Sequence, residues 1–186
     1  MTNGVLVTGT DVGVGTTTVA ATLVASRPGA IHVRPVPTGT VQGRTLPLGL
    51  PPGLAARDVG ARVERAHLLA PFSGLDLVVG EGAGGLLVEL GTDGTTLADL
   101  AADLELPLVL VTRATAGALN HTRLTLEASW ARGLRVLGLV VNGYPSDPDS
   151  ATTTTLAELE RMAPVMAVLP LLDHPPVAAD LPRIEW

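Results

Sequence analysis

Short aliphatic runs alternate with helix-length segments along this 186-residue chain, and this alternation limits the possible folds more than any other feature. The runs lie at residues 4–9, 30–36, 75–82, 106–112, 136–143 and 163–170. Several lack strict polar alternation, which is typical of strands buried on both faces. Helices are expected at about residues 17–26, 58–69, 95–103, 117–132 and 151–161. The pattern predicts an α/β fold with a mostly parallel sheet flanked by helices.

Two segments interrupt the alternation. Residues 37–57 are rich in proline and glycine and have no clear periodicity, so we expect a long loop rather than a linker between domains. Residues 173–186 are expected to be irregular. We find no internal repeat, and the length suits a single domain over residues 1–186.

Composition excludes several classes of protein. Hydrophobic residues make up 46% of the chain and aromatic residues only 2%, which favours a globular core of Ala, Val and Leu. The net charge of −6 and the pI near 5.1 argue against nucleic acid or an anionic membrane as a partner. The chain has no cysteine, no signal-peptide pattern at its start and no apolar stretch of membrane-spanning length. These features suit a cytoplasmic protein.

The chain contains no lysine. Lysine and arginine together number 12, and arginine accounts for all of them. A coding bias that replaces lysine with arginine on the surface explains this composition as well as a functional cause does. Whatever its origin, any mechanism that needs a lysine side chain is closed to this protein.

Residues 8–18, TGTDVGVGTTT, are expected to connect the first strand to the first helix. Small residues allow backbone N–H groups to converge on an anion, and the helix N-terminus adds its dipole. The hydroxyl of Thr17 stands where a phosphate-binding loop places a ligand of Mg²⁺. A tight turn with a threonine cap is the common alternative, although this stretch alone favours phosphate binding.

Glu81 follows the aliphatic run LDLVVG, and mostly glycine and alanine come after it. A carboxylate at the carboxyl end of a parallel strand, beside a phosphate loop, can hold Mg²⁺ directly or through water. The glycines allow a ligand to approach the main chain closely. Alone, this stretch is better explained as a capping acid beside a flexible turn. Two such features in one parallel sheet favour a ligand site.

Other strand and helix ends carry polar residues. Arg34 ends a strand, where its guanidinium can bind phosphate or carboxylate at two points or simply be a solvated charge. Residues 117–120 open a helix whose free N–H groups form an anion site, although Asn120 also suits an ordinary first turn. Asn142 ends another strand and can contact a base edge. The four histidines show no metal-ligand spacing, so we assign none to a metal.

Taken in order, these motifs resemble those of the ATP-dependent dethiobiotin synthetase family, especially its actinobacterial members. The matching stretches cover most of the chain: VTGTDVGVGTT, RPVPTGT, ARDVG, VVGEGAGGLLVEL, TLADLA, ALNHTRLTLEA, VVN and LPLL. The combination of EGAGG with LNHTRLTLEA is specific, whereas a bare phosphate loop is not. The resemblance implies a P-loop NTPase-like fold, shared with MinD-like proteins, and a homodimer.

The resemblance also implies a reaction that uses Mg²⁺ and ATP. In it, 7,8-diaminononanoate and CO2 give a carbamate, ATP phosphorylates the carbamate, and closure of the ureido ring releases phosphate. The residues implied are Gly13, Val14, Gly15, Thr16, Thr17, Thr18 and Asn142 for the nucleotide, Thr17, Asp58 and Glu81 for Mg²⁺, Thr10, Thr38, Gly82, Ala83, Gly84 and Asn120 for the substrate, and Thr16 and Arg34 for catalysis. Asn120 is expected to act across the dimer interface.

The chain departs from the family pattern at both lysines. Thr16 stands where the phosphate loop has lysine, Arg34 stands where the KPV motif has lysine, and Gly13 replaces an often acidic residue. The segment between Asp58 and Asp76 is also shorter than usual. One charge-assisted hydrogen bond is worth about 1.5–3 kcal/mol in binding. Removing a donor to the transition state costs about 10²–10³ in rate, so turnover is more sensitive to these changes than binding is.

Two other functions therefore stay open. One is a catalytically impaired nucleotide-binding paralogue with a binding or regulatory role. The other is a MinD-like partitioning ATPase, which fits less well because such proteins normally need the missing lysines and because no membrane-targeting helix is evident.

Overall fold

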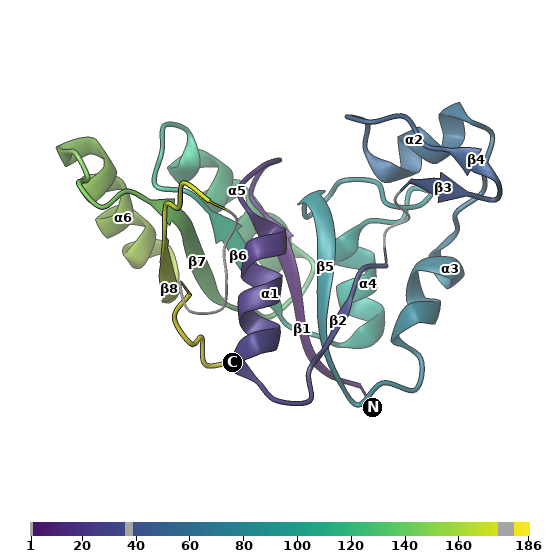
Figure 1. Cartoon of the computed structure of the whole chain (residues 1–186), viewed down its shortest axis with the longest axis horizontal. Helices are drawn as coiled ribbons and strands as arrows, with labels where there is room; N and C mark the ends of the chain where they lie inside the picture. The colour runs from purple at the N-terminus through teal and green to yellow at the C-terminus, as the bar shows by residue number, and fades with distance from the viewer. Residues whose placement is uncertain (1, 36–38, 175–180) are drawn as a thin grey trace.

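The aliphatic runs form the strands of one parallel sheet. The computed structural model describes residues 2–35, 39–174 and 181–186. Within these ranges the sheet contains β1 (Asn3–Gly9), β2 (Ile31–Val33), β5 (Leu77–Gly85), β6 (Leu108–Thr112), β7 (Val136–Tyr144) and β8 (Val165–Pro170). They lie in the order β2-β5-β1-β6-β7-β8, and every adjacent pair is parallel (Figure 1). The predicted α/β fold is confirmed.

Most of the predicted helices form, with ends shifted by one or two residues. They are α1 (Thr16–Ser26), α4 (Leu97–Leu104), α5 (Ala118–Ala131) and α6 (Ser150–Met162). Helix α4 begins later than predicted because Thr96 and Asp99 form a capping box, in which each side chain accepts a hydrogen bond from the other residue's backbone N–H. Among the described residues, no helix has both the length and the apolar character that a membrane crossing needs.

The predicted helix at residues 58–69 is wrong. The structure has α2 (Pro52–Asp58) and α3 (Arg65–Leu69), followed by the 3-10 helix η1 (Ala70–Phe72). Helix α2 begins early because Pro52 occupies its first turn, where a missing N–H costs little. Gly60, with a φ of +68°, interrupts the helical path, and Glu64 starts α3 through a capping box. Asp58 therefore ends a helix, although we expected it to begin one.

The predicted loop at residues 37–57 also contains regular structure. Strands β3 (Thr40–Val41) and β4 (Arg44–Thr45) form an antiparallel hairpin, and α2 follows it. The turn residues Gln42 and Gly43 have φ of +49° and +75°, as a two-residue hairpin turn of the primed type requires. Gln-Gly is a weaker turn signal than Asn-Gly, so the sequence did not reveal the hairpin. In Figure 1 the hairpin and α2 lie beyond the β2–β5 side of the sheet.

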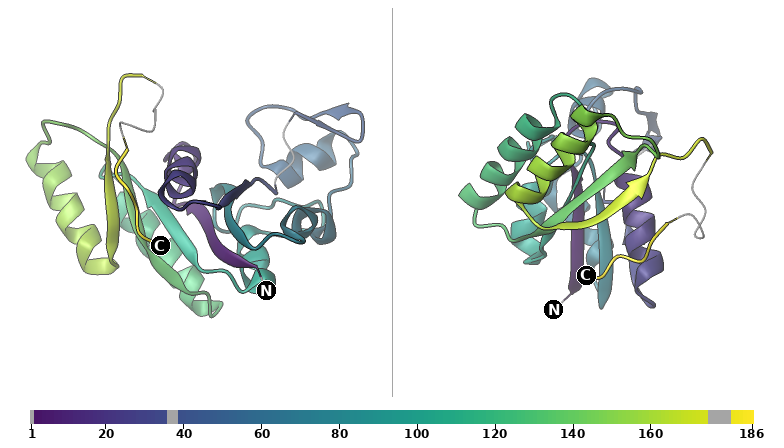
Figure 2. Two further views of the ribbon diagram at one scale, coloured as in Figure 1. Left: turned by 60° about the horizontal axis from the view of Figure 1, so that its bottom comes forward. Right: turned by 90° about the vertical axis from the view of Figure 1, so that its left-hand side faces the viewer.

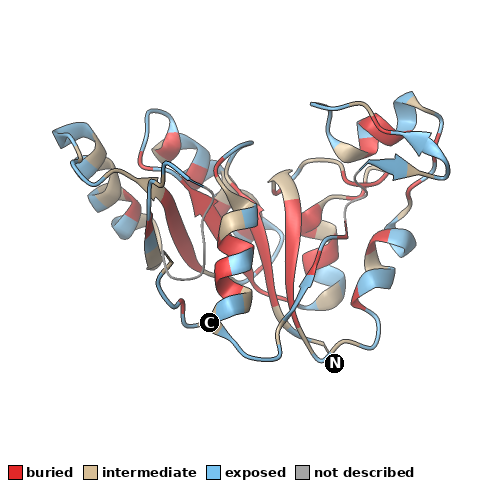
Figure 3. Cartoon of the chain, in the orientation of Figure 1, coloured by how far each residue is buried: buried red, intermediate tan, exposed pale blue. Residues whose placement is uncertain are grey.

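Side chains of β1 alternate between two apolar layers. Val5 and Val7 pack in the layer that contains α1, whereas Leu6 packs in the layer that contains α4, α5 and α6. Figure 2 shows α1 on one face of the sheet and α5 and α6 on the other. Buried residues follow the central strands in Figure 3. Because both faces are covered, these strands are continuously apolar, which explains the runs in the sequence.

The described C-terminal residues pack against α1 without forming a helix or strand, as the predicted irregular tail requires. The indole N–H of Trp186 donates a 3.0 Å hydrogen bond to the carbonyl of Leu23. The guanidinium of Arg27 lies 4.7 Å from the centroid of the indole ring. Ile184 is buried and donates its backbone N–H to the hydroxyl of Ser26. These contacts extend the apolar layer beside α1.

Candidate active site

The loop expected to bind phosphate connects β1 to α1 at the carboxyl edge of the sheet. Gly13 and Gly15 have φ of +76° and +99°, and Gly15 is the N-cap of α1. Side chains rarely tolerate this backbone conformation, so the two glycines determine the path of the loop. The first turn of α1, which contains Thr16, Thr17 and Thr18, has no acidic residue. Its free N–H groups and the helix dipole therefore favour an anion beside the loop.

Glu81 lies on β5 next to this loop, and its side chain is only 3% exposed. The hydroxyl of Thr17 donates a 2.5 Å hydrogen bond to its Oε1. The glycines on either side leave room for their neighbours, because a Cβ at Gly80 would lie 2.3 Å from a methyl carbon of Leu6, and one at Gly82 would lie 2.5 Å from a side-chain carbon of Leu97. The structure thus brings together two of the three predicted metal ligands, Thr17 in the first turn of α1 and Glu81 on β5.

Arg34 and His32, which come from β2 and its carboxyl end, complete the contacts of Glu81. The guanidinium of Arg34 donates from Nε to Oε2 at 2.9 Å and from Nη2 to Oε1 at 2.8 Å. The same Nη2 also donates to the hydroxyl of Thr17 at 2.9 Å. His32 Nε2 lies 2.9 Å from Oε2. The ligand that Arg34 meets in this structure is therefore a carboxylate of the protein itself.

These contacts keep Glu81 ionised. Burial is the largest influence and on its own would raise the pKa of Glu81. Hydrogen bonds from Arg34 and Thr17, together with the charges of Arg34 and His32, outweigh burial and hold the pKa below its usual value. The hydrogen bond to Glu81 in turn raises the pKa of Arg34. Glu81 is thus an anionic ligand at neutral pH.

The chemistry of Thr17 and Glu81 suits Mg²⁺, since a hydroxyl and a carboxylate are hard oxygen ligands. The third predicted ligand, Asp58, is exposed at the end of α2. Within the described residues it forms no hydrogen bond or ion pair with Thr17 or Glu81, and no three acidic, histidine or cysteine side chains gather as a metal site. Two of the three predicted ligands therefore lie together, although Arg34 holds their oxygens in this structure, and Asp58 does not join them.

Asn142, predicted to contact the base, holds the phosphate loop. This buried residue of β7 donates its side-chain amide to the carbonyl of Val14 at 2.9 Å. A Cβ on Gly15 would lie 2.0 Å from the same amide nitrogen. The amide therefore occupies the space that a side chain at residue 15 would need. Asn142 connects the loop after β1 to β7, which lies two strands away in the sheet.

Of the predicted substrate residues that the structure describes, Thr10 lies in the loop, three lie on β5 and Asn120 lies on α5. The hydroxyl of Thr10 donates to that of Thr112 at 3.3 Å, next to the glycine-rich end of β5, which contains Gly82, Ala83 and Gly84. Asn120 is exposed in the first turn of α5. Thr38 lies outside the described residues. An open cavity of about 360 Å³, lined by Thr10, Val12 and Leu87 among others, separates the loop from α5.

Arg113 is a residue that sequence reasoning missed. It follows β6, and its Nη2 donates a 2.8 Å hydrogen bond to the carbonyl of Gly13 in the loop. The available signal was its position directly after the aliphatic run LPLVLVT, which is the same kind of position that drew attention to Arg34. His32 was missed for a different reason, because a contact with a carboxylate leaves no spacing pattern.

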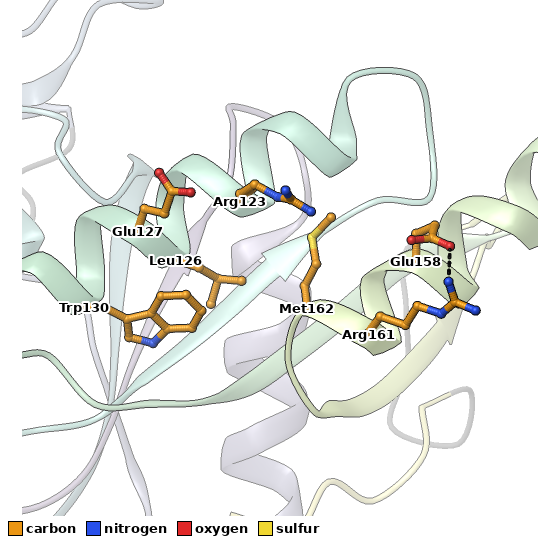
Figure 4. A pocket seen from close by; sticks show the side chains of 7 residues that line it. All are labelled: Arg123, Leu126, Glu127, Trp130, Glu158, Arg161 and Met162. Atoms are coloured by element: carbon orange, nitrogen blue, oxygen red, sulfur yellow. Dashed lines mark hydrogen bonds and ion pairs between the residues drawn. The ribbon is translucent and has the colours of Figure 1, made fainter.

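Another cavity, of about 290 Å³, lies away from the loop between α5 and α6. Figure 4 shows Trp130 and Leu126 of α5 on one side and Met162 of α6 on the other, with the Glu158–Arg161 ion pair near its edge. None of the predicted site residues lines it.

The parallel sheet and the loop that opens α1 define the class of protein: an α/β protein of the P-loop NTPase-like fold. Two solved structures show this. MinD of Pyrococcus horikoshii, complexed with Mg-ADP, is 18% identical and aligns with a TM-score of 0.55 over 92% of this chain and 82% of its own. A putative plasmid partition protein of Borrelia burgdorferi, bound to AMPPNP, is 10% identical and aligns with a TM-score of 0.61 over 93% and 86%. At these identities the likeness concerns the fold alone.

Sequence relatives narrow the class to a family. The ATP-dependent dethiobiotin synthetase of Mycobacterium avium is 41% identical over 89% of this chain and 85% of its own length. That of Corynebacterium diphtheriae is 38% identical over 85% of this chain and 83% of its own. A family model described as an AAA domain matches residues 42–175. The chain belongs to the dethiobiotin synthetase family.

Proposed function

We propose that this protein is an ATP-dependent dethiobiotin synthetase, which closes the ureido ring of dethiobiotin from 7,8-diaminononanoate and CO2. The observation that carries the proposal is the contact between Thr17 of the phosphate loop and Glu81 of the adjacent strand. It lies in a chain 41% identical to a dethiobiotin synthetase over most of both lengths. The loop alone supports only nucleotide binding, whereas the glycine-rich strand after Glu81 and the helix that carries Asn120 supply the rest of the site.

The reaction has three bond-forming steps. One amine of the substrate attacks CO2 and gives a carbamate, and a carbamate oxygen then attacks the γ-phosphorus of ATP and releases ADP. The second amine attacks the carbamoyl carbon, which closes the ring and expels phosphate. We assign the phosphates to the backbone of residues 13–18, and Thr16 contributes one hydroxyl donor in place of a lysine charge.

We assign Arg34 to the charge that develops on the carbamate and the transferring phosphoryl group. A guanidinium keeps the positive charge of the family lysine and binds oxyanions at two points. It must exchange its contacts with Glu81 for contacts with the substrate. Thr17 and Glu81 are the Mg²⁺ ligands that we propose, and Asp58 joins them on the family resemblance alone. The ion would neutralise phosphate charge.

We also propose a homodimer located in the cytoplasm, where ATP is available. Leu124, 57% exposed on α5, lies one helical turn after Asn120 and therefore on the same face of the helix. Val12 of the loop and Leu87 are exposed beside it and line the same cavity. An exposed apolar patch around the substrate residues is a feature of interfaces and supports the prediction that Asn120 serves the partner's site.

One observation favours the alternative, a catalytically impaired nucleotide-binding paralogue with a binding or regulatory role. Arg34 occupies both oxygens of Glu81 and the hydroxyl of Thr17, so the one cation of the former KPV motif is held by the protein. Turnover then requires Arg34 to leave Glu81 before it can contact the substrate. A lysine at this position would be held less firmly, because an ammonium cannot form the same two-point contact with a carboxylate.

The test is ADP release by the purified protein with Mg²⁺, ATP, diaminononanoate and bicarbonate, with dethiobiotin detected by mass spectrometry. We expect ADP release to depend on both the diamine and bicarbonate. Nucleotide binding without ADP release would select the paralogue. Failure to bind any nucleotide would contradict both functions.

A further inference from the structure

Arg113 lies between the phosphate loop and the end of β7. Its Nη2 donates to the carbonyl of Gly13 at 2.8 Å. Its Nε lies 4.0 Å from the position that a Cβ on Gly143 would take, one residue after Asn142. The side chain also lines a cavity of about 160 Å³ together with Thr10 and other loop residues. The guanidinium therefore lies beside the loop that is proposed to bind the nucleotide phosphates.

This guanidinium has donors to spare. A guanidinium carries five N–H donors, and within the described residues the one hydrogen bond that the side chain of Arg113 makes is the bond to Gly13. Its side chain is exposed, so an anion can reach it. Arg34, on the other side of the loop, differs because it is engaged by Glu81 and Thr17. The chain has no lysine, so a side-chain cation at this loop must be an arginine, and the guanidinium of Arg113 keeps donors for a phosphate.

The local charge favours such a cation. Asp11 is exposed in the same loop, and its carboxylate accepts a hydrogen bond from the backbone N–H of Val12. His121 approaches that carboxylate at 3.8 Å and offsets its charge only when protonated. A nucleotide carries several negative charges, so an unbalanced Asp11 would repel it. Arg113 brings the charge of this side of the loop back to neutrality.

We propose that Arg113 binds the phosphate groups of the nucleotide and supplies the charge that the loop lost with its lysine. The proposal rests on the proposed use of a nucleotide by this loop. In this way Arg113, which follows β6, takes over the role of the lysine that the family pattern has at position 16, in the first turn of α1. Its planar fork contacts two phosphate oxygens at once, while the loop backbone continues to provide the cradle.

The experiment compares Arg113→Gln with wild-type protein by calorimetry, using AMPPNP with Mg²⁺, inorganic tripolyphosphate and adenosine as probes. Loss of one charge-assisted contact is expected to weaken AMPPNP and tripolyphosphate by about tenfold to a hundredfold. Adenosine carries no phosphate, so its affinity is expected to stay within about twofold. The ratio of the two affinities on one preparation is independent of the folded fraction. Arg113→Lys, which keeps the charge, is expected to retain most of the affinity.

Arg132→Gln is the matched control, because Arg132 is also exposed and also donates one hydrogen bond to a backbone carbonyl, that of Ala128. It is expected to bind like wild type. In a Thr16→Lys background, Arg113→Gln should cost less than in wild type, since the new lysine supplies the same charge. Equal AMPPNP affinity in wild type and Arg113→Gln would overturn the inference while leaving nucleotide use intact. If wild type bound none of the probes, the proposed function would fall as well.

Discussion

Arg34 and Glu81 form a two-point ion pair at the position expected for Mg²⁺. The guanidinium contacts both carboxylate oxygens, at 2.9 Å and 2.8 Å, and the hydroxyl of Thr17 at 2.9 Å. These are the same oxygens that a divalent cation would use. Arg34 would therefore compete with an ion bound by the proposed ligands Thr17 and Glu81, and this competition would lower the metal affinity of the site.

The first prediction is that Arg34→Gln tightens binding of Mn²⁺ to the nucleotide-free protein. Removing the competing cation is expected to lower Kd by about tenfold, the equivalent of about 1.4 kcal/mol. Titration of free Mn²⁺ by electron paramagnetic resonance measures this without any need for turnover. Arg161→Gln, which breaks the exposed Arg161–Glu158 pair on α6, is the control and should leave Mn²⁺ affinity unchanged. Identical affinities in wild type and Arg34→Gln would mean that the ion does not use these oxygens.

The second prediction concerns the loop that lost its lysine. Thr16→Lys is expected to tighten ATP binding by about ten- to a hundredfold, because it adds one charge-assisted contact to an existing backbone cradle. Calorimetry with and without Mg²⁺ measures the change. Thr18→Lys adds the same charge two positions later in the same helix and should have a smaller effect. Turnover should rise further if Arg34 serves the carbamate, and hardly at all if it does not. Absence of nucleotide binding in both proteins would reduce the loop to a turn.

The sequence predicted the sheet well because strands buried on both faces leave continuous apolar runs. Each run of this kind became a strand, and the carboxyl-edge rule correctly placed Thr17 beside Glu81. The hairpin around Gln42 and helix α2 were not predicted, since proline- and glycine-rich segments carry no apolar periodicity. The assignment of residues 1–186 to one domain stays a prediction.

The partners of polar side chains were beyond sequence reasoning. Position on a strand end places Arg34 and Asn142 at the site, but it does not show what they bind. In the structure Arg34 meets Glu81, and the amide of Asn142 meets the carbonyl of Val14. Which partner a polar side chain contacts depends on the direction of the side chain and on differences of a few ångströms in backbone position. The roles proposed for these residues toward ligands stay predictions.

A third prediction follows from the capping box of α4. Burial, the largest influence, opposes ionisation of Asp99, but hydrogen bonds from the hydroxyl and backbone N–H of Thr96 outweigh it and lower the pKa of Asp99. The folded pKa is depressed, so this carboxylate stabilises the fold fully above its unfolded value of about 3.9. The contribution is lost as the pH falls through the folded value.

We therefore expect Asp99→Ala to lower the free energy of unfolding by about 0.5–2 kcal/mol at pH 7, the usual worth of a cap. The difference from wild type should shrink as the pH falls below about 4. Urea unfolding at several pH values measures it. A difference that stays constant or grows on acidification would show that the ionised carboxylate is not what stabilises the helix start.

The fourth prediction tests the fit between Gly15 and Asn142. Gly15→Ala combines a φ of +99° with a Cβ placed 2.0 Å from the amide nitrogen of Asn142. Gly13→Ala is a matched control, since its φ is +76° but no atom lies within 4 Å of the added carbon. Both substitutions introduce backbone strain of about 1–3 kcal/mol. Gly15→Ala should cost more than that, and Asn142→Ala should remove the excess. Equal melting temperatures for the two glycine variants would contradict this fit.

The last prediction is that Leu124→Glu disrupts the proposed homodimer. Leu124 is 57% exposed on the face of α5 that carries Asn120, and Val12, 80% exposed, lies across the same cavity. A carboxylate in the centre of an apolar interface would be desolvated without a partner, which costs several kcal/mol. Light scattering at micromolar concentration should therefore show about twice the chain mass of 19.0 kDa for wild type and the single mass for the variant.

Leu48→Glu is the control for the change in charge, because Leu48 is 98% exposed and is not among the residues that line this cavity. It should leave the mass unchanged. The same dimer predicts complementation, since Asn120 would serve the partner's site. Mixing an Asn120→Ala chain with a Glu81→Gln chain should form some sites with both residues intact and restore part of the diamine-dependent binding or turnover. If the wild-type protein were monomeric, this would contradict the shared site, because Asn120 could not then contact a substrate bound to a second subunit.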